Sequence, residues 1–167
     1  VPSKWGMAAL RDLTANNVKV TVLTNSLCAT DVAAVHSGYA RYRKDLLNAG
    51  VELYEVKPDF APPKIRDKGL TGSSATSLHA KTFVVDGKRV FIGSLNFDPR
   101  SARLNTEMGM VIDHAEIAGD MRQELEKITP QYAYKVVMDK QRKRLRWQDP
   151  DRPDVLLKNE PDAGIWK

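Results

Sequence analysis

A histidine, a lysine and an aspartate stand at fixed spacing in the stretch HAKTFVVD, residues 79–86. Residues two apart on a β-strand project from the same face, so His79 and Lys81 are expected to share one surface. Asp86 and Gly87 form a dipeptide that is typical of a tight hairpin turn. An imidazole nucleophile beside a fixed cation suits attack on a phosphoryl group, whose charged oxygens need several donors in the transition state.

The strand that returns from this turn ends in GSLN and is expected to lie beside His79. Gly93 would let the backbone approach an oxyanion closely, and the hydroxyl of Ser94 and the amide of Asn96 would add donors. A carboxylate behind the histidine would fix its tautomer and stabilise the imidazolium, and Glu107 on the following strand is the candidate. Together these groups predict a site for phosphate esters.

Each of these residues also has a plainer explanation. A lone histidine on a strand is usually packed or solvated, a lysine two positions along is usually a surface charge, and Asp-Gly is usually only a turn. The spacing H-x-K-x4-D arises by chance in roughly one such chain in a hundred, and adding G-S-x-N lowers this by orders of magnitude. The combination therefore favours a catalytic site.

The segments HAKTFVVD and GSLNFD together resemble the signature H-x-K-x4-D-x6-G-(G/S)-x-N of the phospholipase D superfamily, and Glu107 matches that family's downstream acidic residue. The resemblance implies a covalent mechanism in which His79 attacks phosphorus to give a phosphohistidine, without a metal or an organic cofactor. Asp86 would be more structural than chemical. The implied catalytic residues are His79, Lys81, Asp86 and Glu107, and the implied phosphate-binding residues are Lys81, Ser94 and Asn96.

An active site of this family is built from two such motifs that face each other, and this sequence contains one. The second histidine would protonate the leaving alcohol and later activate the acceptor. His36 and His114 lack a lysine two positions later and are interpreted as helix-surface or helix-start residues. The second half is expected from an upstream domain or from a second copy in a symmetric dimer. Because the chain opens on Val1, a fragment of a longer protein is expected.

Flanking stretches indicate a subfamily, because they resemble those of bacterial cardiolipin synthases and related phosphatidyltransferases. These stretches are VLTNSLCATDVAAVHSGYARYRKDLLNAGVELYEVKP, NFDPRSARLNTE and the tail RWQD…NEPDAGIWK. The implied substrate is a phospholipid similar to phosphatidylglycerol, and the implied location is the bacterial cytoplasm, peripheral to the inner membrane. Two alternatives stay open: a metal-independent phosphodiesterase nuclease that acts as a homodimer, and a basic binding module without catalysis.

The composition of the 167 residues, 42% hydrophobic and 28% charged, fits one globular domain and excludes a disordered chain. A formal net charge of +5 favours partners that carry phosphate, either a nucleic acid backbone or anionic lipid head groups. Cys28 is the single cysteine, so no intrachain disulfide can form, and it is expected to be buried. No run approaches the roughly 20 apolar residues that cross a bilayer.

Helical and strand patterns alternate in the first part of the chain. Helices are predicted over 4–16 and 30–50, the second beginning at Thr30 and ending at Gly50, and strands over 18–25 and 51–56. The fold class is therefore α/β, with a mixed β-sheet flanked by helices. The resemblance implies one half of a phospholipase D-like α-β-α sandwich.

The predicted site follows a long surface loop, residues 57–77, and precedes a tail of different character. Strands are predicted over 78–85, 88–94, 104–113, 134–139 and 155–158, and a helix over 115–128. The predicted units are a catalytic half-domain, 1–130, and a basic C-terminal extension, 131–167, that packs on it. The basic run from Lys140 to Arg146 either docks on anionic head groups or is a solvated strand, and Trp147 and Trp166 either line the pocket rim or fill a small core.

Overall fold

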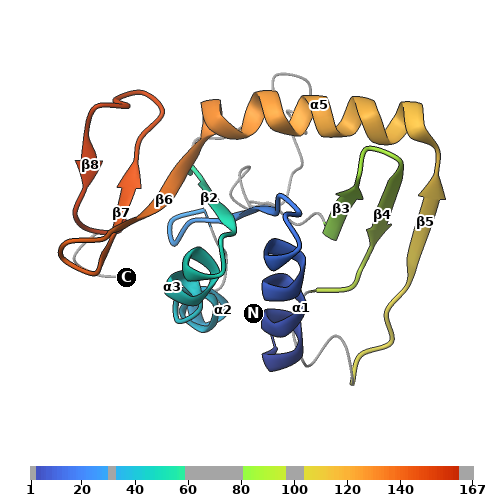
Figure 1. Cartoon of the computed structure of the whole chain (residues 1–167), viewed down its shortest axis with the longest axis horizontal. Coiled ribbons are helices and arrows are strands. Elements are labelled where there is room, and N and C mark those ends of the chain that lie inside the picture. The colour runs from blue at the N-terminus through green and yellow to red at the C-terminus, as the bar shows by residue number, and fades with distance from the viewer. Residues whose placement is uncertain (1–2, 30–32, 59–80, 97–103, 162–167) are drawn as a thin grey trace, which may run out of the picture.

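The structure is a computed structural model that describes residues 3–29, 33–58, 81–96 and 104–161. In these parts of the chain, the strands form two sheets and the helices pack around them (Figure 1). The described helices are α1 (Lys4–Ala15), α2 (Ala33–Ala40), α3 (Arg43–Asn48) and α5 (Ala115–Tyr132). The predicted loop after Pro58 and the N-cap at Thr30 lie outside the described residues.

The larger sheet has the strand order β1-β2-β6-β7-β8. Its first two strands are parallel, and each later strand is antiparallel to its neighbour. This mixed pattern follows from the connections, since helices join the first two strands whereas turns join the last three. The strands are β1 (Thr21–Asn25), β2 (Glu52–Val56), β6 (Ala133–Asp139), β7 (Arg144–Gln148) and β8 (Leu156–Leu157).

The smaller sheet contains the predicted hairpin. β3 (Lys81–Val85) and β4 (Arg89–Gly93) are antiparallel, and β5 (Gly109–Asp113) is antiparallel to β4. Asp86 and Gly87 have φ angles of 53° and 63°, and the amide of Lys88 donates to the carbonyl of Val85 at 3.0 Å. Positive φ at both residues is the geometry that Asp-Gly favours in tight hairpin turns, and Lys88 also belongs to the loop because Val85 pairs with Arg89. The predicted turn is confirmed.

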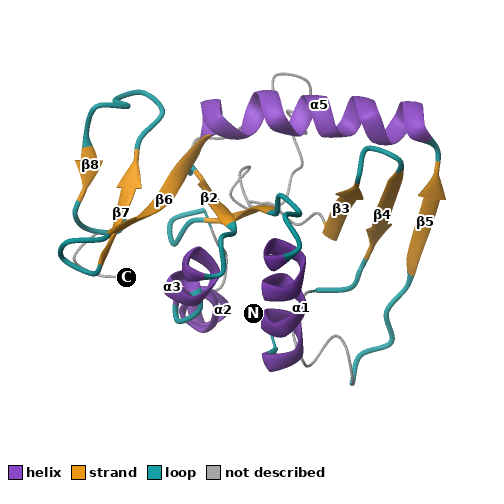
Figure 2. Ribbon diagram, viewed as in Figure 1, coloured by secondary structure: helices purple, strands orange, loops and turns teal. Residues whose placement is uncertain are grey.

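Helix α5 connects the two sheets. It contacts β3 and β4 of the smaller sheet and β2 and β6 of the larger one. In the view of Figure 2, α5 runs across the top and α1, α2 and α3 lie below it, with β7 and β8 on the left and β3, β4 and β5 on the right. This arrangement confirms the predicted α/β class, a mixed sheet flanked by helices. Within the described residues, no helix combines the length and apolar character needed to cross a bilayer.

The hydrophobic core lies between the larger sheet and the helices beneath it. Leu53 of β2 and Val136 of β6 are 0% and 1% exposed, and Leu46 of α3 and Met7 of α1 pack into the same cluster. Trp147 of β7 is also buried there, so it fills the core and does not line a rim. Trp166 lies outside the described residues. Cys28 is half-buried, less than expected.

The single helix predicted over 30–50 is wrong, because a turn at Arg41 and Tyr42 divides it into α2 and α3. The amide of Tyr42 donates to the carbonyl of Tyr39 at 2.8 Å. Tyr39 of α2 and Arg43 of α3 lie on either side of this turn and both reach the same buried carboxylate, as described below. The predicted helix end is confirmed, since Gly50 has φ of 86° and its amide donates to the carbonyl of Leu47 at 3.0 Å.

The basic run divides between a turn and a strand. Lys140, Arg142 and Lys143 are exposed in the β6–β7 turn, whereas Arg146 on β7 is only 6% exposed. Arg146 donates to Asp139 at 3.3 Å. The run is therefore neither wholly solvated nor wholly available to a partner, because its turn residues are exposed whereas Arg146 is buried and paired with Asp139.

Candidate active site

Lys81, Gly93, Ser94 and Glu107 lie at one end of the smaller sheet. Lys81 is the first residue of β3 and lies opposite Gly93, the last residue of β4. Gly93 in turn lies opposite Gly109, the first residue of β5. Ser94 directly follows Gly93, and Glu107 stands two residues before β5. The antiparallel register therefore brings one cation, one hydroxyl and one carboxylate to the same end of the smaller sheet.

A hydrogen bond joins two of these groups directly. The hydroxyl of Ser94 donates to Oε2 of Glu107 at 2.5 Å. It also accepts from the amide of Met108 at 3.0 Å, and the amide of Ser94 donates to the carbonyl of Met108 at 2.8 Å. The side-chain amide of Asn105 donates to Oε1 of Glu107 at 3.2 Å. Both oxygens of the carboxylate are thus held by neutral donors.

Sequence reasoning missed Asn105 as a partner of Glu107. The signal was present in the segment LNTE, because residues two apart on an extended chain can face the same side. Ser94 was predicted to bind phosphate, and here its hydroxyl proton is directed at the carboxylate. A hydroxyl has one proton, so while Ser94 donates it to Glu107 the side chain has none to donate to a phosphate oxygen, and binding phosphate would require the hydroxyl to turn away from the carboxylate.

The glycines at this end are required by packing. A Cβ at Gly93 would lie 2.6 Å from the carbonyl oxygen of Met108 and 2.8 Å from the ring of Phe91. A Cβ at Gly109 would lie 2.4 Å from the same ring. Phe91 stacks on Phe83 across the hairpin, with ring centroids 4.7 Å apart. The ring therefore occupies the space that two missing side chains leave, which is a steric reason for Gly93 besides the expected approach of an oxyanion.

The remaining signature residues lie elsewhere. Asp86 is in the hairpin turn, at the far end of β3 from Lys81, which at the rise of a strand is on the order of 15 Å away. The structure thus does not bring Asp86 to the other site residues. Asn96 is exposed, two residues after Ser94. His79 lies outside the described residues, so its role stays a prediction.

A second polar cluster lies buried in the larger sheet. The carboxylate of Glu55 on β2 is 0% exposed. It accepts from the hydroxyl of Tyr39 at 2.7 Å, from Nε of Arg43 at 2.7 Å and from Nε1 of Trp147 at 2.9 Å. The guanidinium of Arg43 also donates to Glu160 at 2.5 Å. Within the described residues, no buried side-chain nitrogen or oxygen lacks a hydrogen-bond partner.

These contacts shift pKa values in directions that follow from burial and charge. Burial beside Glu55 raises the pKa of the Tyr39 hydroxyl. Burial alone would raise the pKa of Glu160, but hydrogen bonds from His36 and Arg43 outweigh it and lower the pKa to about 2. The Glu160 carboxylate is therefore ionised at neutral pH.

His36 belongs to this cluster, so its interpretation as a helix-surface residue is wrong. It is 5% exposed, and its Nε2 lies 2.5 Å from Glu160 and 2.8 Å from the guanidinium of Arg43. The contact with Glu160, which the helix pattern does not reveal, covers His36 on this face of α2. His114 begins α5, where its Nδ1 accepts from the amide of Ile117 at 3.4 Å, and the prediction of a helix-start residue is confirmed.

A cavity of about 620 Å³ opens beside this cluster, and the signature residues do not line it. Lys57 reaches Asp149 at 3.0 Å there and also bonds Asp151. Burial opposes protonation, but these hydrogen bonds raise the pKa of Lys57. Since Lys57 and Arg152 are already paired with Asp149, this cavity is a weaker candidate for anion binding than the end of the smaller sheet at which Lys81 lies.

The chain is similar to curated proteins over its whole length. It is 49% identical to cardiolipin synthase C of Escherichia coli (strain K12) over 173 residues, which is all of this chain and 36% of that protein. It is 31% identical to cardiolipin synthase A of Pseudomonas aeruginosa over 126 residues, 75% of this chain and 22% of that protein. The chain thus spans about a third of the length of the first of these relatives.

The fold is similar to a solved structure, the phospholipase D family member Nuc from Salmonella typhimurium. The TM-score is 0.55, with 17% sequence identity, 80% of this chain covered and 74% of that chain covered. The architecture is therefore that of a phospholipase D-like protein, as the signature implied. Residues 1–129 match the family described as cardiolipin synthase, PLD-like domain, and the chain belongs to that family.

Proposed function

We propose that this chain supplies one half of the active site of a phosphatidyltransferase, in which His79 is the nucleophile. This proposal rests on one observation. Lys81 lies at the same end of the smaller sheet as Ser94 and Glu107, and a hydrogen bond joins the last two. A cation and hydroxyl beside a held carboxylate are the parts that phosphoryl transfer through a histidine requires. The phospholipid substrate is supported by the similarity to cardiolipin synthase C.

In the first step, an imidazole nitrogen of His79 attacks phosphorus, a P–N bond forms, and the P–O bond to the leaving alcohol breaks. The leaving oxygen takes a proton from an acid on the opposite side of the phosphate. Lys81 and Asn96 stabilise the charge on the remaining phosphate oxygens, and Glu107 positions and stabilises the positively charged ring. Asp86, at the hairpin turn, supports the strand and takes no part in bond making.

In the second step, the hydroxyl of an acceptor alcohol attacks phosphorus and the P–N bond breaks, which restores His79. The acceptor's proton passes to the group that gave up its proton in the first step. An acceptor lipid gives transfer, whereas water gives hydrolysis. The acid and base of both steps come from a second motif, in a preceding domain or a second copy of this chain.

Turnover of phosphatidylglycerol by the enzyme that contains this chain tests the nucleophile. His79→Ala is expected to lower turnover by about 10²-fold or more while the unfolding midpoint stays within the range of a surface substitution. His114→Asn is the matched control, because it removes a different histidine while asparagine preserves the helix cap. Unchanged turnover in His79→Ala would contradict the proposal.

Trapping of the intermediate provides a second test. A labelled phospholipid should leave an acid-labile label on His79, and label on Ser94 would be inconsistent with the mechanism. A labelled oligonucleotide, offered under the same conditions, distinguishes the substrate. If the enzyme cleaves DNA and leaves phospholipid unchanged, the site is that of a phosphodiesterase nuclease.

A further inference from the structure

The cations of the described chain fall into two groups. Six of them form ion pairs, and these are Lys19 with Glu52, Arg43 with Glu55, Lys57 with Asp149, Arg89 with Asp113, Arg146 with Asp139 and Arg152 with Asp149. A second group is exposed and makes no ion pair with another described residue. Its members on α1, at the start of α3 and in or beside the β6–β7 turn are Arg11, Arg41, Lys44, Lys140, Arg142, Lys143 and Arg144, and we call them the basic surface.

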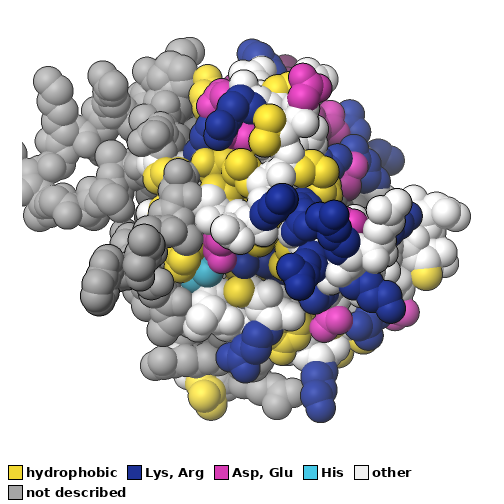
Figure 3. All heavy atoms as spheres, turned by 90° about the vertical axis from the view of Figure 1, so that its left-hand side faces the viewer, with side chains coloured by type: hydrophobic (Ala, Val, Ile, Leu, Met, Phe, Trp, Pro, Cys, Tyr) yellow, Lys and Arg dark blue, Asp and Glu magenta, His cyan; other side chains and the backbone are white. Residues whose placement is uncertain are grey.

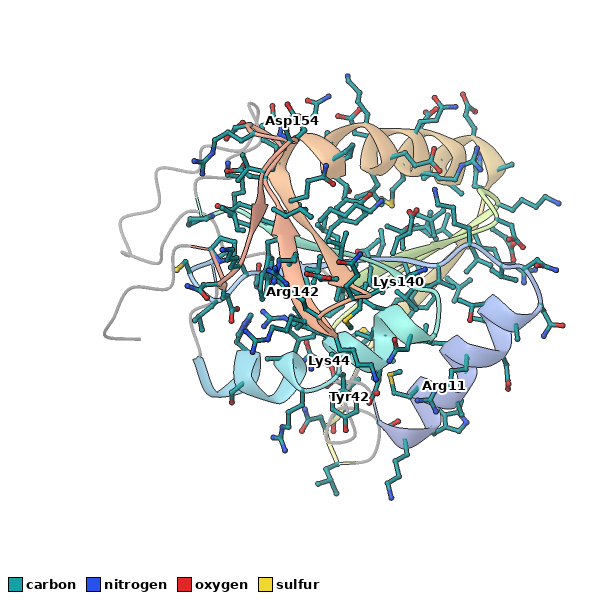
Figure 4. All side chains as sticks on the ribbon, turned by 60° about the vertical axis from the view of Figure 1, so that its left-hand side comes forward. Arg11, Tyr42, Lys44, Lys140, Arg142 and Asp154 are labelled. Atoms are coloured by element: carbon teal, nitrogen blue, oxygen red, sulfur yellow. The ribbon has the colours of Figure 1, made fainter. Side chains whose placement is uncertain are left out.

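The basic surface is assembled by folding from three distant parts of the chain. Arg11 comes from α1, Lys44 from α3, and Lys140 and Arg142 from the β6–β7 turn (Figure 4). Helix α3 packs against the β6–β7 hairpin, with the guanidinium of Arg43 5.3 Å from the ring of Trp147. Figure 3 shows Lys and Arg side chains gathered over the middle of this face of the molecule.

The local acids do not neutralise the turn. Asp139 stands just before it, but one carboxylate oxygen accepts from the guanidinium of Arg146 at 3.3 Å and the other accepts from the backbone amide of Arg142 at 3.1 Å. Asp12 and Asp45 are exposed neighbours of Arg11 and Lys44 along the helices. Seven cations against two such acids leave this face with an excess of positive charge.

Unpaired cations on a broad face fit a partner with many anionic groups. We propose that the basic surface docks the protein on anionic phospholipid head groups, with the β6–β7 turn nearest the membrane. The choice of a lipid as the partner rests on the proposed function. Long Lys and Arg side chains reach phosphates without a shaped pocket, and their attraction to an anionic leaflet sums over residues. Arg146, the remaining cation of the run, is buried and does not face the partner, but it pairs with Asp139, the acid that precedes the turn.

Co-sedimentation with vesicles of phosphatidylcholine, with and without phosphatidylglycerol, tests the docking directly. The triple variant Lys44→Gln, Lys140→Gln and Arg142→Gln is expected to bind anionic vesicles about 10²-fold more weakly, at roughly 1 kcal/mol for each cation. Wild-type binding should fall as salt is added, because salt screens exposed charges. Neutral vesicles should bind both proteins weakly.

The matched control removes three charges from the other side of the molecule. Lys88, Arg122 and Lys127 are exposed on the β3–β4 turn and α5, where acids such as Glu124 and Glu126 stand among them. Their triple substitution by Gln changes the net charge equally and should retain most of the binding. The proposed surface would be overturned if both triple variants lost vesicle binding equally. It would also be overturned if the variant of Lys44, Lys140 and Arg142 bound anionic vesicles as tightly as the wild type.

Two further readouts separate this proposal from the proposed function. With a short-chain phospholipid dissolved below its micellar concentration, the first triple variant should turn over substrate at the wild-type rate, because no membrane is involved. If neither the wild type nor the variants turn over lipid, the proposed function fails, and vesicle binding still tests the basic surface. Tighter binding of the wild type to duplex DNA than to anionic vesicles at the same salt would overturn the choice of partner.

Discussion

The two sheets of this protein use polar residues in opposite ways. In the larger sheet and the helix packed on it, Glu55 of β2 and Arg43 of α3 are almost fully buried, and within the described residues no buried side-chain nitrogen or oxygen lacks a hydrogen-bond partner. In the smaller sheet, Ser94 and Asn96 are exposed, and Met110 and Val111 of β5 are 64% and 63% exposed. A buried charge network holds several elements in one arrangement, whereas a reactive site needs side chains that a ligand can reach.

The comparison predicts different outcomes for substitutions in the two regions. A change in the larger sheet should lower the free energy of unfolding first and activity only as a consequence. A change at the end of the smaller sheet that carries the candidate site should lower activity with little effect on the free energy of unfolding. The following predictions begin with the largest expected effect.

Arg43→Met should be the most destabilising. It leaves Glu55 and Glu160 without their shared cation, and an uncompensated buried carboxylate costs about 3–5 kcal/mol. Urea denaturation at neutral pH measures the loss. Lys44→Met is the control, since it removes an exposed neighbouring cation and should change the free energy of unfolding by about 0.5 kcal/mol or less. Similar values for the two variants would mean that the buried cluster does not stabilise the fold.

Glu107→Gln, in the smaller sheet, should lower activity and leave stability nearly unchanged. The amide keeps the shape but removes the charge that would stabilise an imidazolium, so turnover is expected to fall by about 10²-fold. The free energy of unfolding should change by less than about 1 kcal/mol, because the carboxylate's partners are exposed. The pH dependence of turnover should also shift, which a structural role would not produce. Glu126→Gln on α5 serves as the control.

Gly109→Ala tests packing within the smaller sheet. The new Cβ would meet the ring of Phe91 at 2.4 Å, and overpacking of this kind costs about 1–3 kcal/mol. Phe91→Leu in the same chain removes the clashing ring atoms. The double variant should therefore lose less stability than the sum of the two single variants, as measured by urea denaturation. Simple additivity would show that the ring does not need the glycine.

The pKa of Glu160 predicts a smaller, pH-dependent effect. Its folded-state pKa of about 2 lies below the ordinary value of 4.5, so its contribution is present above about pH 4.5 and is lost as the pH falls toward 2. Compared with Glu160→Gln, the wild type should be more stable by about 1–2 kcal/mol at pH 6, allowing for partial exposure of the carboxylate. This difference should shrink at pH 3. A constant difference would exclude titration of Glu160 as its cause.

Local patterns predicted much of the smaller sheet from sequence. Strand alternation and the Asp-Gly pair placed Lys81 and Gly93 at one end of a hairpin, and the structure confirms the turn and the pairing. The link from Ser94 to Glu107 was not predicted, since it depends on the register of β5 against β4. Register is set by pairing between strands, which a single strand's pattern does not contain.

The larger sheet was harder to predict, and His36 shows why. Its helical position was visible, but its burial arises from Glu160, 124 residues later in the chain. The same holds for the break between α2 and α3, where Tyr39 and Arg43 turn toward Glu55 on β2. Propensity and periodicity describe neighbours in sequence, whereas these contacts join residues from distant elements.

The sequence by itself determined the reactive residue types, their spacing, the hairpin and the α/β class, because each depends on short-range order. Only the tertiary structure decided that Asp86 lies far from Lys81, that Arg146 is turned inward, and that Arg11, Lys44 and Arg142 share one face. Burial and charge grouping are properties of surfaces that meet after the chain has folded. No pattern confined to one segment specifies them.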